Sequence, residues 1–160
     1  MWQEVWGTVL SEFSDIPDAT QITRITLRLL VAAVLGGLLG YQRELQGKSA
    51  GVRTHMMVAI GAALFVLIPQ QAGASQADLS RVLQGLTAGV GFLGAGAIIL
   101  GNKELETRGL TTAAGIWVTA AIGVAAGMGR ESTALLSTAI ALFVLSVIPL
   151  IYRAKGKDTE

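Results

Sequence analysis

Five long apolar segments separated by short polar loops constrain the fold of this chain more than any other feature. They cover residues 25–41, 55–71, 82–100, 110–128 and 133–151. The last three contain no Lys, Arg, Asp or Glu, whereas the first contains Arg28 and the second is interrupted late by Pro69. A helix of this length measures roughly 28 Å, close to the hydrocarbon thickness of a bilayer. A soluble bundle would need a polar face on each helix, and these segments are apolar nearly all round. We therefore predict an all-α, polytopic membrane bundle of about five transmembrane helices.

The basic residues indicate how these spans are oriented. Eight of the twelve Lys and Arg residues fall on one side of the five-span topology: Arg43, Lys48, Arg53, Lys103, Arg108, Arg153, Lys155 and Lys157. Arg81 and Arg130 occupy the opposite loops, and Arg24 and Arg28 lie at the entrance to the first span. By the positive-inside rule, we expect the N-terminus outside and residues 153–160 in the cytoplasm as a basic tail.

The composition favours a single membrane domain over residues 22–152. The chain has 20 Gly and only 14% charged residues, which is typical of closely packed membrane helices. It has no Cys, so disulfides and thiolate metal sites are excluded. The net charge is +1 and the basic residues, apart from Arg28, lie in loops and at the ends of spans, so no stripe for binding nucleic acid is present.

Residues 1–18 are predicted to form a short amphipathic helix at the outer membrane interface. Apolar residues recur at helical spacing, namely Trp2, Val5, Trp6, Val9, Leu10 and Phe13. The helix is expected to end at Asp15-Ile16-Pro17. A frayed tail, or a segment docked on a neighbouring subunit, is the alternative.

Glycines recur at spacings that predict close helix packing. The positions singled out are Gly36 and Gly40 in the first span, Gly91, Gly94 and Gly96 in the third, and Gly115, Gly123 and Gly127 in the fourth. Residues 89–94 also match G-x-G-x-x-G, but a dinucleotide site needs a preceding strand, which a membrane span does not supply. Unwound backbone around Gly91 that lines a cavity is the alternative to packing.

Polar residues gather where the second and fourth spans begin on the cytoplasmic side. Thr54, Thr111 and Thr112 are placed to cap helix N-termini, with Arg53 and Arg108 beside them. Arg43, Glu44 and His55 are close by in the topology. We predict a pocket here for a phosphate, an acidic side chain or a lipid headgroup. Ordinary interfacial anchoring, with Glu44 paired to an Arg, is the alternative.

A second polar cluster is expected on the outer side. Arg28 lies one turn inside the first span, where a charged side chain faces protein or water or extends to the interface. Asp78 and Arg81 occupy the loop on the same side and are its expected partners. Residues that would ligate a metal are not indicated; His55 is the only histidine, and a hydrogen-bonded interfacial role is favoured for it over metal ligation or pH sensing.

Four segments in series resemble the MgtC/SapB family of bacterial inner-membrane proteins. They are residues 39–44 (LGYQRE), 50–55 (AGVRTH), 91–96 (GFLGAG) and 109–114 (GLTTAA) followed by Trp117. The resemblance covers about residues 24–129. It implies a multi-pass inner-membrane protein associated with growth under magnesium limitation and, in some bacteria, survival inside host cells, with modulation of the membrane ATP synthase as a proposed role.

The resemblance also shows where this chain departs from the family. Asp78 matches an acidic position that the family has before the third span, whereas Gln42 stands where an acidic residue is common. Longer members have a soluble cytoplasmic C-terminal domain, so this chain is expected to be a short form without it.

Three functional classes compete, and an enzyme is not expected because no nucleophile, base and orienting residue converge. We expect a regulator or accessory factor linked to magnesium limitation, which binds another membrane complex such as ATP synthase. The alternatives are an oligomeric magnesium or cation transporter lined by rings of Glu44 or Asp78, and an anion-binding protein or transporter using Arg53 and Arg108. No cofactor is expected, and Mg²⁺ enters only through the resemblance. The expected partners are the bilayer, further copies of the chain and another membrane protein.

Overall fold

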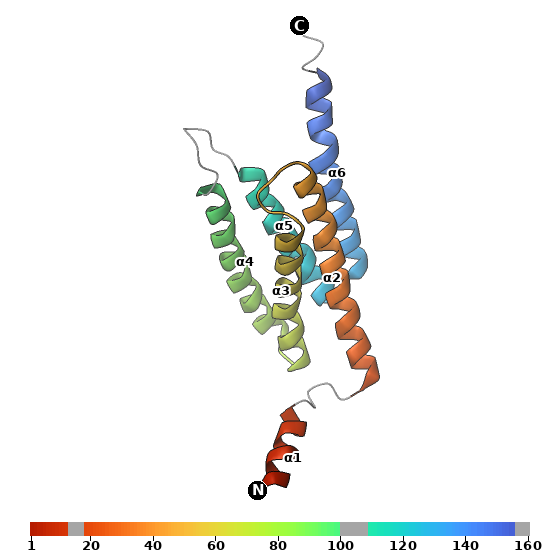
Figure 1. The fold of residues 1–160 in the computed structure, drawn as a ribbon, viewed down its shortest axis with the longest axis vertical. Coiled ribbons are helices and arrows are strands. Elements are labelled where there is room, and N and C mark those ends of the chain that lie inside the picture. The colour runs from red at the N-terminus through yellow and green to blue at the C-terminus, as the bar shows by residue number, and fades with distance from the viewer. Residues whose placement is uncertain (13–17, 100–108, 156–160) are drawn as a thin grey trace.

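The computed structural model describes residues 1–12, 18–99 and 109–155, and within those ranges it is helical, without a strand (Figure 1). The helices are α1 (Trp2–Glu12), α2 (Ala19–Leu45), α3 (Val52–Gln71), α4 (Gln76–Ile99), α5 (Leu110–Gly127) and α6 (Glu131–Lys155). Helices α2 to α6 each contain a stretch long and apolar enough to cross a membrane. The predicted polytopic helical bundle is confirmed.

The helices extend beyond the apolar segments from which they were predicted. Helix α2 begins six residues before the predicted residue 25, because Asp18 caps it by accepting a hydrogen bond from the Gln21 N–H at 2.7 Å. Helix α6 runs from Glu131 to Lys155, past the predicted residues 133–151 at both ends. Pro69 lies inside α3, which continues to Gln71. Hydropathy marks the part of a helix that crosses the membrane, whereas hydrogen bonds determine its ends.

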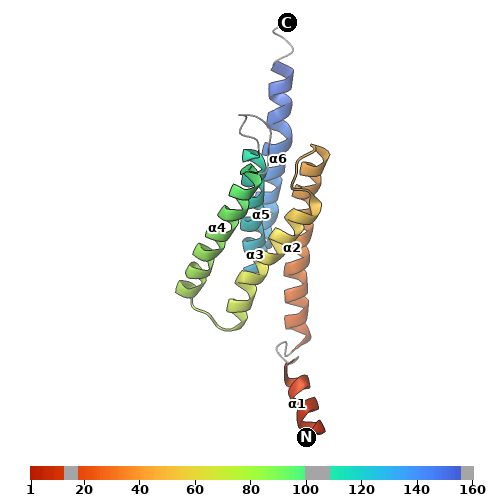
Figure 2. The ribbon, with the colours of Figure 1, turned by 60° about the vertical axis from the view of Figure 1, so that its left-hand side comes forward.

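Helix α5 is the centre of the bundle. It contacts α2, α3, α4 and α6, and half of its most apolar window is buried. Helix α4 stands at the edge of the bundle, contacting only α3 and α5 among the helices (Figures 1 and 2). Helix α1 contacts none of the other helices and lies beyond the end at which α2 begins. Its interfacial role therefore stays a prediction, and its expected end at Asp15-Ile16-Pro17 falls outside the described residues.

Glycine and alanine bring α3 close to α2 and α5. A Cβ added to Gly36 would lie 2.8 Å from the Cβ of Ala59, and one added to Gly123 would lie 2.8 Å from the Cα of the same Ala59. Gly127 faces Ala63 in the same way. Side chains larger than hydrogen would separate these backbones, so α3 is held between α2 and α5 by dispersion contacts that only small residues permit.

The glycines of α4 differ from this pattern. A Cβ on Gly94 would lie 3.5 Å from the Cβ of Ala113, an ordinary contact, and one on Gly91 or Gly96 would meet no atom within 4 Å in the described part of the chain. The predicted packing role of Gly91 and Gly96 thus does not apply within one protomer. The reason is that α4 lies at the edge of the bundle, and the sides of the helix that bear these two glycines do not pack against α3 or α5. Helix α4 is also continuous through Gly91 and Gly96, without unwound backbone.

Candidate functional site

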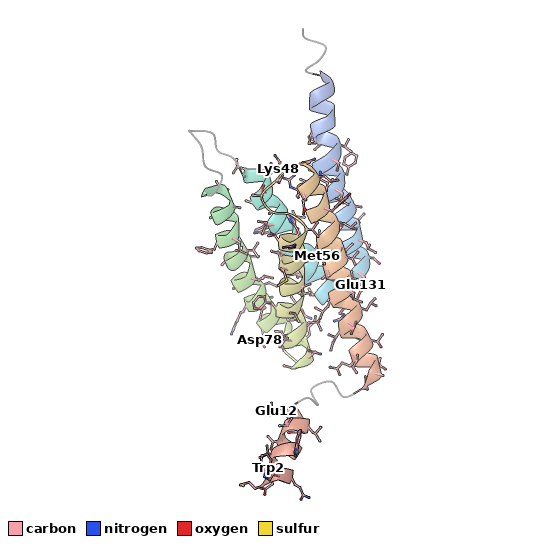
Figure 3. The ribbon with its side chains drawn as sticks, viewed as in Figure 1. Trp2, Glu12, Lys48, Met56, Asp78 and Glu131 are labelled. Atoms are coloured by element: carbon pink, nitrogen blue, oxygen red, sulfur yellow. The ribbon has the colours of Figure 1, made fainter. Side chains whose placement is uncertain are left out.

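The fold brings four segments together at one end of the bundle. They are the last turn of α2, the loop from residue 46 to residue 51, the first turn of α5 and the C-terminal half of α6. Figure 3 shows Lys48 at this end and Asp78 at the opposite one. The distribution of charged loops predicts that the Lys48 end is the cytoplasmic one.

Arg43 is the central side chain of this end. It lies in the last turn of α2 and is only 1% exposed. Its Nη1 donates a hydrogen bond to Gln46 Oε1 at 3.2 Å, while Nε and Nη2 have no partner in the described part of the chain. The loop folds back because the N–H groups of Gln46 and Lys48 both donate to the Arg43 carbonyl, with Gly47 at a φ of +65°. The chain thus buries a guanidinium with most of its donors unused.

Arg43 lines a cavity of about 650 Å³ between α2, α5 and α6. The other lining residues are Leu45, Gln46, Lys48, Thr111, Val144, Leu145, Ser146, Ile148 and Pro149. Two of these ten side chains are cationic and none is acidic. The cavity is therefore suited to an anionic group, and its wall on α6 is largely apolar.

A second cavity of about 380 Å³ adjoins the first between α5 and α6. Thr111, Val144 and Leu145 line both. His55 lines this cavity and is fully buried. Its Nδ1 lies 3.0 Å from the Gly51 carbonyl oxygen, and its Nε2 has no partner within residues 1–12, 18–99 and 109–155. A Cβ on Gly115 would lie 3.5 Å from that Nε2, so the small residue leaves the ring nitrogen open toward α5.

Two glutamines hold α6 against α2 beside these cavities. The Nε2 groups of Gln42 and Gln46 donate to the carbonyl oxygen of Leu145 at 3.0 and 3.1 Å. In an uninterrupted helix this carbonyl would accept from the residue four positions later, which here is Pro149 and has no N–H. The glutamines therefore satisfy a carbonyl that proline leaves free inside an apolar environment.

This bond also explains the departure at Gln42 noted in the sequence. A carboxylate at that position has no N–H to donate, so it could not satisfy the Leu145 carbonyl. Gln42 and Gln46 were not among the predicted site residues. Their role depends on Leu145 of α6, which follows Gln42 by 103 residues and Gln46 by 99, and the sequence signal for it is Pro149.

The predicted helix caps are wrong. Helix α3 is capped at Gly51 and α5 at Gly109, and neither has a side-chain capping bond. Instead, Glu44 Oε2 accepts from the Val52 N–H at 3.0 Å, because the turn after α2 places this carboxylate over the start of α3. Within residues 1–12, 18–99 and 109–155, Glu44 forms no ion pair with an Arg, because the ion pair found there joins the N-terminal amine to Glu4. The chain's own carboxylate thus occupies the anion-binding position at α3.

The remaining predicted residues divide between the cavities and the surface. Thr111 lines both cavities, and Thr112 is buried in α5. Arg53 and Thr54 are exposed and line neither cavity. Arg108 lies outside the described residues. The structure therefore places Arg43, His55 and Thr111 together with Lys48 around these two cavities. Lys48 was not among the predicted site residues. Its place in a short loop that returns toward Arg43 is the sequence signal that indicates it.

The predicted outer cluster does not form. Arg28 Nη1 donates to the Gly127 carbonyl at 3.0 Å and to Gln70 Oε1 at 3.4 Å, so it binds the C-terminal end of α5 instead of Asp78 or Arg81. Positive charge is favoured there because the unpaired carbonyls and the helix dipole are negative.

Asp78 has a structural role in α4. Its Oδ2 accepts from the Ser75 hydroxyl at 2.6 Å and from the Ser75 N–H at 3.3 Å, and its own N–H donates to Ser75 Oγ. This reciprocal arrangement is a capping box, which satisfies N–H groups at the start of the helix. No group of three or more His, Cys, Asp or Glu that could hold a metal ion occurs in the described part of the chain.

Comparison with known proteins finds one family and several curated relatives. The family model of the MgtC family matches residues 29–154, which include α3 to α5 and most of α2 and α6. The chain is 39% identical over 140 residues to the putative magnesium transporter YhiD of Escherichia coli, covering 82% of this chain and 64% of that protein. No solved structure matches the chain.

Two further relatives show similar identity. Protein SrpB of Synechococcus elongatus is 42% identical over 133 residues, with coverage of 76% of this chain and 73% of that protein. Protein MgtC of Salmonella typhimurium is 41% identical over 116 residues, covering 72% of this chain but only 48% of that protein. The chain thus spans about half to three quarters of the length of these relatives.

Proposed function

This chain belongs to the MgtC family of multi-pass bacterial inner-membrane proteins, and from that premise we propose that it is a regulator or accessory factor linked to magnesium limitation. In this role it binds another membrane complex, such as ATP synthase, and does not itself carry Mg²⁺. The transport named for the Escherichia coli relative is the competing function.

The observation that carries the proposal is the charge of the buried polar groups. Arg43, buried at the predicted cytoplasmic end, lies in a cavity with Lys48 and with no carboxylate among the described lining residues, and Arg28 binds the opposite end of α5. Mg²⁺ prefers carboxylate oxygens and retains several of its waters, so a positively charged interior opposes its passage. Both acidic residues that were candidates for a pore, Glu44 and Asp78, are engaged in helix capping.

Self-association forms part of this proposal, and the edge helix α4 supports it. Phe92 is 81% exposed on α4, and Gly91 and Gly96 leave its face open. The exposed Phe92 can pack against another transmembrane helix, and the glycines on either side of it leave room for that helix to approach. A second copy, or the partner complex, would then contact α4 while the α2–α3–α5 core stays intact.

Magnesium flux and growth tests separate the regulator from the transporter. Purified protein in proteoliposomes is expected to give no saturable Mg²⁺ flux above empty liposomes. The same gene is expected to restore growth at low magnesium in a bacterium lacking its own copy. A combined Glu44→Gln and Asp78→Asn variant serves as the control for a carboxylate-lined pore.

Two outcomes would contradict the proposal. Saturable flux that the combined variant loses would establish a transporter with those carboxylates in its path. Failure to restore growth, despite correct insertion and normal protein levels, would remove the link to magnesium limitation.

A further inference from the structure

The two adjoining cavities at the cytoplasmic end form one amphiphilic site, and we propose that it binds an anionic phospholipid. The lipid phosphate contacts Arg43, Lys48 and Thr111, and an acyl chain lies in the groove between α5 and α6. This inference goes beyond the regulatory function and does not depend on it, since a bound lipid is compatible with either a regulator or a transporter.

The charge of the first cavity favours an anion. The guanidinium of Arg43 is 1% exposed, and its Nε and Nη2 have no acceptor among the described residues. A buried charge without partners is strongly unfavourable, and a carboxylate or phosphate relieves that cost. Glu44, the nearest acidic residue in the sequence, is engaged with the Val52 N–H and does not line the cavity.

Further groups around Arg43 add donors for a phosphate. Lys48 supplies an ammonium from the loop above, and Thr111 supplies a hydroxyl from the first turn of α5. The N-cap residue of helix α5 is Gly109, which has no side chain to cap it, so the N–H groups at the positive end of this 18-residue helix have no side-chain capping bond from their own N-cap residue. Phosphate oxygens can accept from all three groups at once.

The apolar walls distinguish a lipid from a soluble phosphate. Leu45, Ile148 and Pro149 surround the cationic cavity, and the groove that continues from it is lined by residues such as Val118 and Ile140. Because α5 and α6 cross the membrane, this groove runs from the headgroup region toward the hydrocarbon. A phospholipid has the same order of chemistry, with a charged headgroup followed by apolar chains, and basic pockets between membrane helices on the cytoplasmic side bind anionic headgroups.

The test measures lipid binding to the purified full-length chain in detergent by native mass spectrometry. Phosphatidylglycerol is the anionic probe, and phosphatidylcholine is the zwitterionic control. Wild-type protein is expected to bind phosphatidylglycerol at least about tenfold more tightly, and millimolar inorganic phosphate is expected not to displace it.

Matched variants locate the site. Arg43→Gln and Lys48→Ala are expected to weaken phosphatidylglycerol binding, the former by about tenfold or more, because charge-assisted hydrogen bonds to phosphate are lost. Arg53→Gln removes an exposed arginine that lines neither cavity and is expected to leave binding unchanged. Ala114→Leu narrows the groove and is expected to weaken lipid binding. Ala139→Leu, at an exposed position of α6 outside both cavities, is the matched control and is expected to leave lipid binding unchanged.

Several results would overturn the proposal. One is equal affinity for the two lipids; another is a loss on Arg53→Gln as large as on Lys48→Ala. Displacement of lipid by inorganic phosphate would identify a free-anion site instead. If Arg43→Gln does not fold, Lys48→Ala and Ala114→Leu decide the question, because Lys48 and Ala114 are exposed and lie outside the buried core.

Discussion

At the scale of residues, the bundle is held by polar side chains that satisfy backbone groups the helices leave free. Glu44 accepts the first N–H of α3, Arg28 donates to the end of α5, and Gln42 donates to the carbonyl freed by Pro149. Each of these bonds joins two different helices. A polar side chain inside a membrane protein therefore stabilises helix packing when it bonds to a backbone group that has no partner within its own helix.

The bond between Gln42 and the Leu145 carbonyl can be tested by a double-mutant cycle. Gln42→Leu is expected to lower the free energy of unfolding by about 0.5–1.5 kcal/mol, since it removes a hydrogen bond to a carbonyl with few alternatives. In a Pro149→Ala background the cost is expected to fall, because the restored N–H at position 149 satisfies that carbonyl. Unfolding in SDS titrations measures the loss of unfolding free energy on Gln42→Leu in each background. Equal losses in the wild-type and Pro149→Ala backgrounds would refute the role of Pro149 in freeing this carbonyl.

At the scale of elements, glycine has different consequences on α5 and α4. On α5, Gly123 and Gly127 face α3 so closely that added side chains would collide with the backbone of Ala59 and Ala63. On α4, Gly89 meets nothing within 4 Å in the described structure. The same residue type therefore makes an interface inside the protomer on one helix and leaves an open face on another.

This difference predicts opposite effects of one added methyl group. Gly123→Ala is expected to destabilise the protein by about 1–3 kcal/mol, because α3 must move away from α5. Gly89→Ala is expected to be neutral or to stabilise by up to about 1 kcal/mol, because alanine is the better helix former and has room. Unfolding in SDS measures both variants, and a larger loss for Gly89→Ala would show that α4 is covered by protein.

At the scale of the whole molecule, the two ends of the bundle differ in chemistry. The end with Arg43 and Lys48 has the cationic cavity, whereas the opposite end has the Ser75–Asp78 capping box and the loop before α6. An anionic leaflet on the cytoplasmic side attracts the first end. In the expected orientation, the proposed lipid site therefore lies at the cytoplasmic leaflet.

The orientation can be checked by labelling single cysteines, because the natural chain has none. Ser49→Cys, in the loop between α2 and α3, is expected to react with an impermeant maleimide only after the cells are opened. Gln71→Cys, at the far end of α3, is expected to react in spheroplasts whose inner membrane is intact. The reverse pattern would place the N-terminus in the cytoplasm.

The sequence by itself determined the number of spans, the all-helical class and the family resemblance, because the length of an apolar segment and a series of local motifs are properties of neighbouring residues. It also located Arg43, His55 and Thr111 near one end of the bundle. It did not predict the partners of these residues: Thr54 caps nothing, Arg28 binds α5, and Glu44 fills the position expected for a ligand.

Only the tertiary structure decided which polar groups meet, and the physical reason is that α6 closes the site from far along the chain. The Leu145 carbonyl binds Gln42, and Leu145 lines both cavities; the local signal, Pro149, indicates a free carbonyl but not which donor reaches it. Hydropathy places each helix along the membrane normal. How the helices turn and pack against one another depends on where glycine and alanine allow backbones to approach and where a free carbonyl needs a donor.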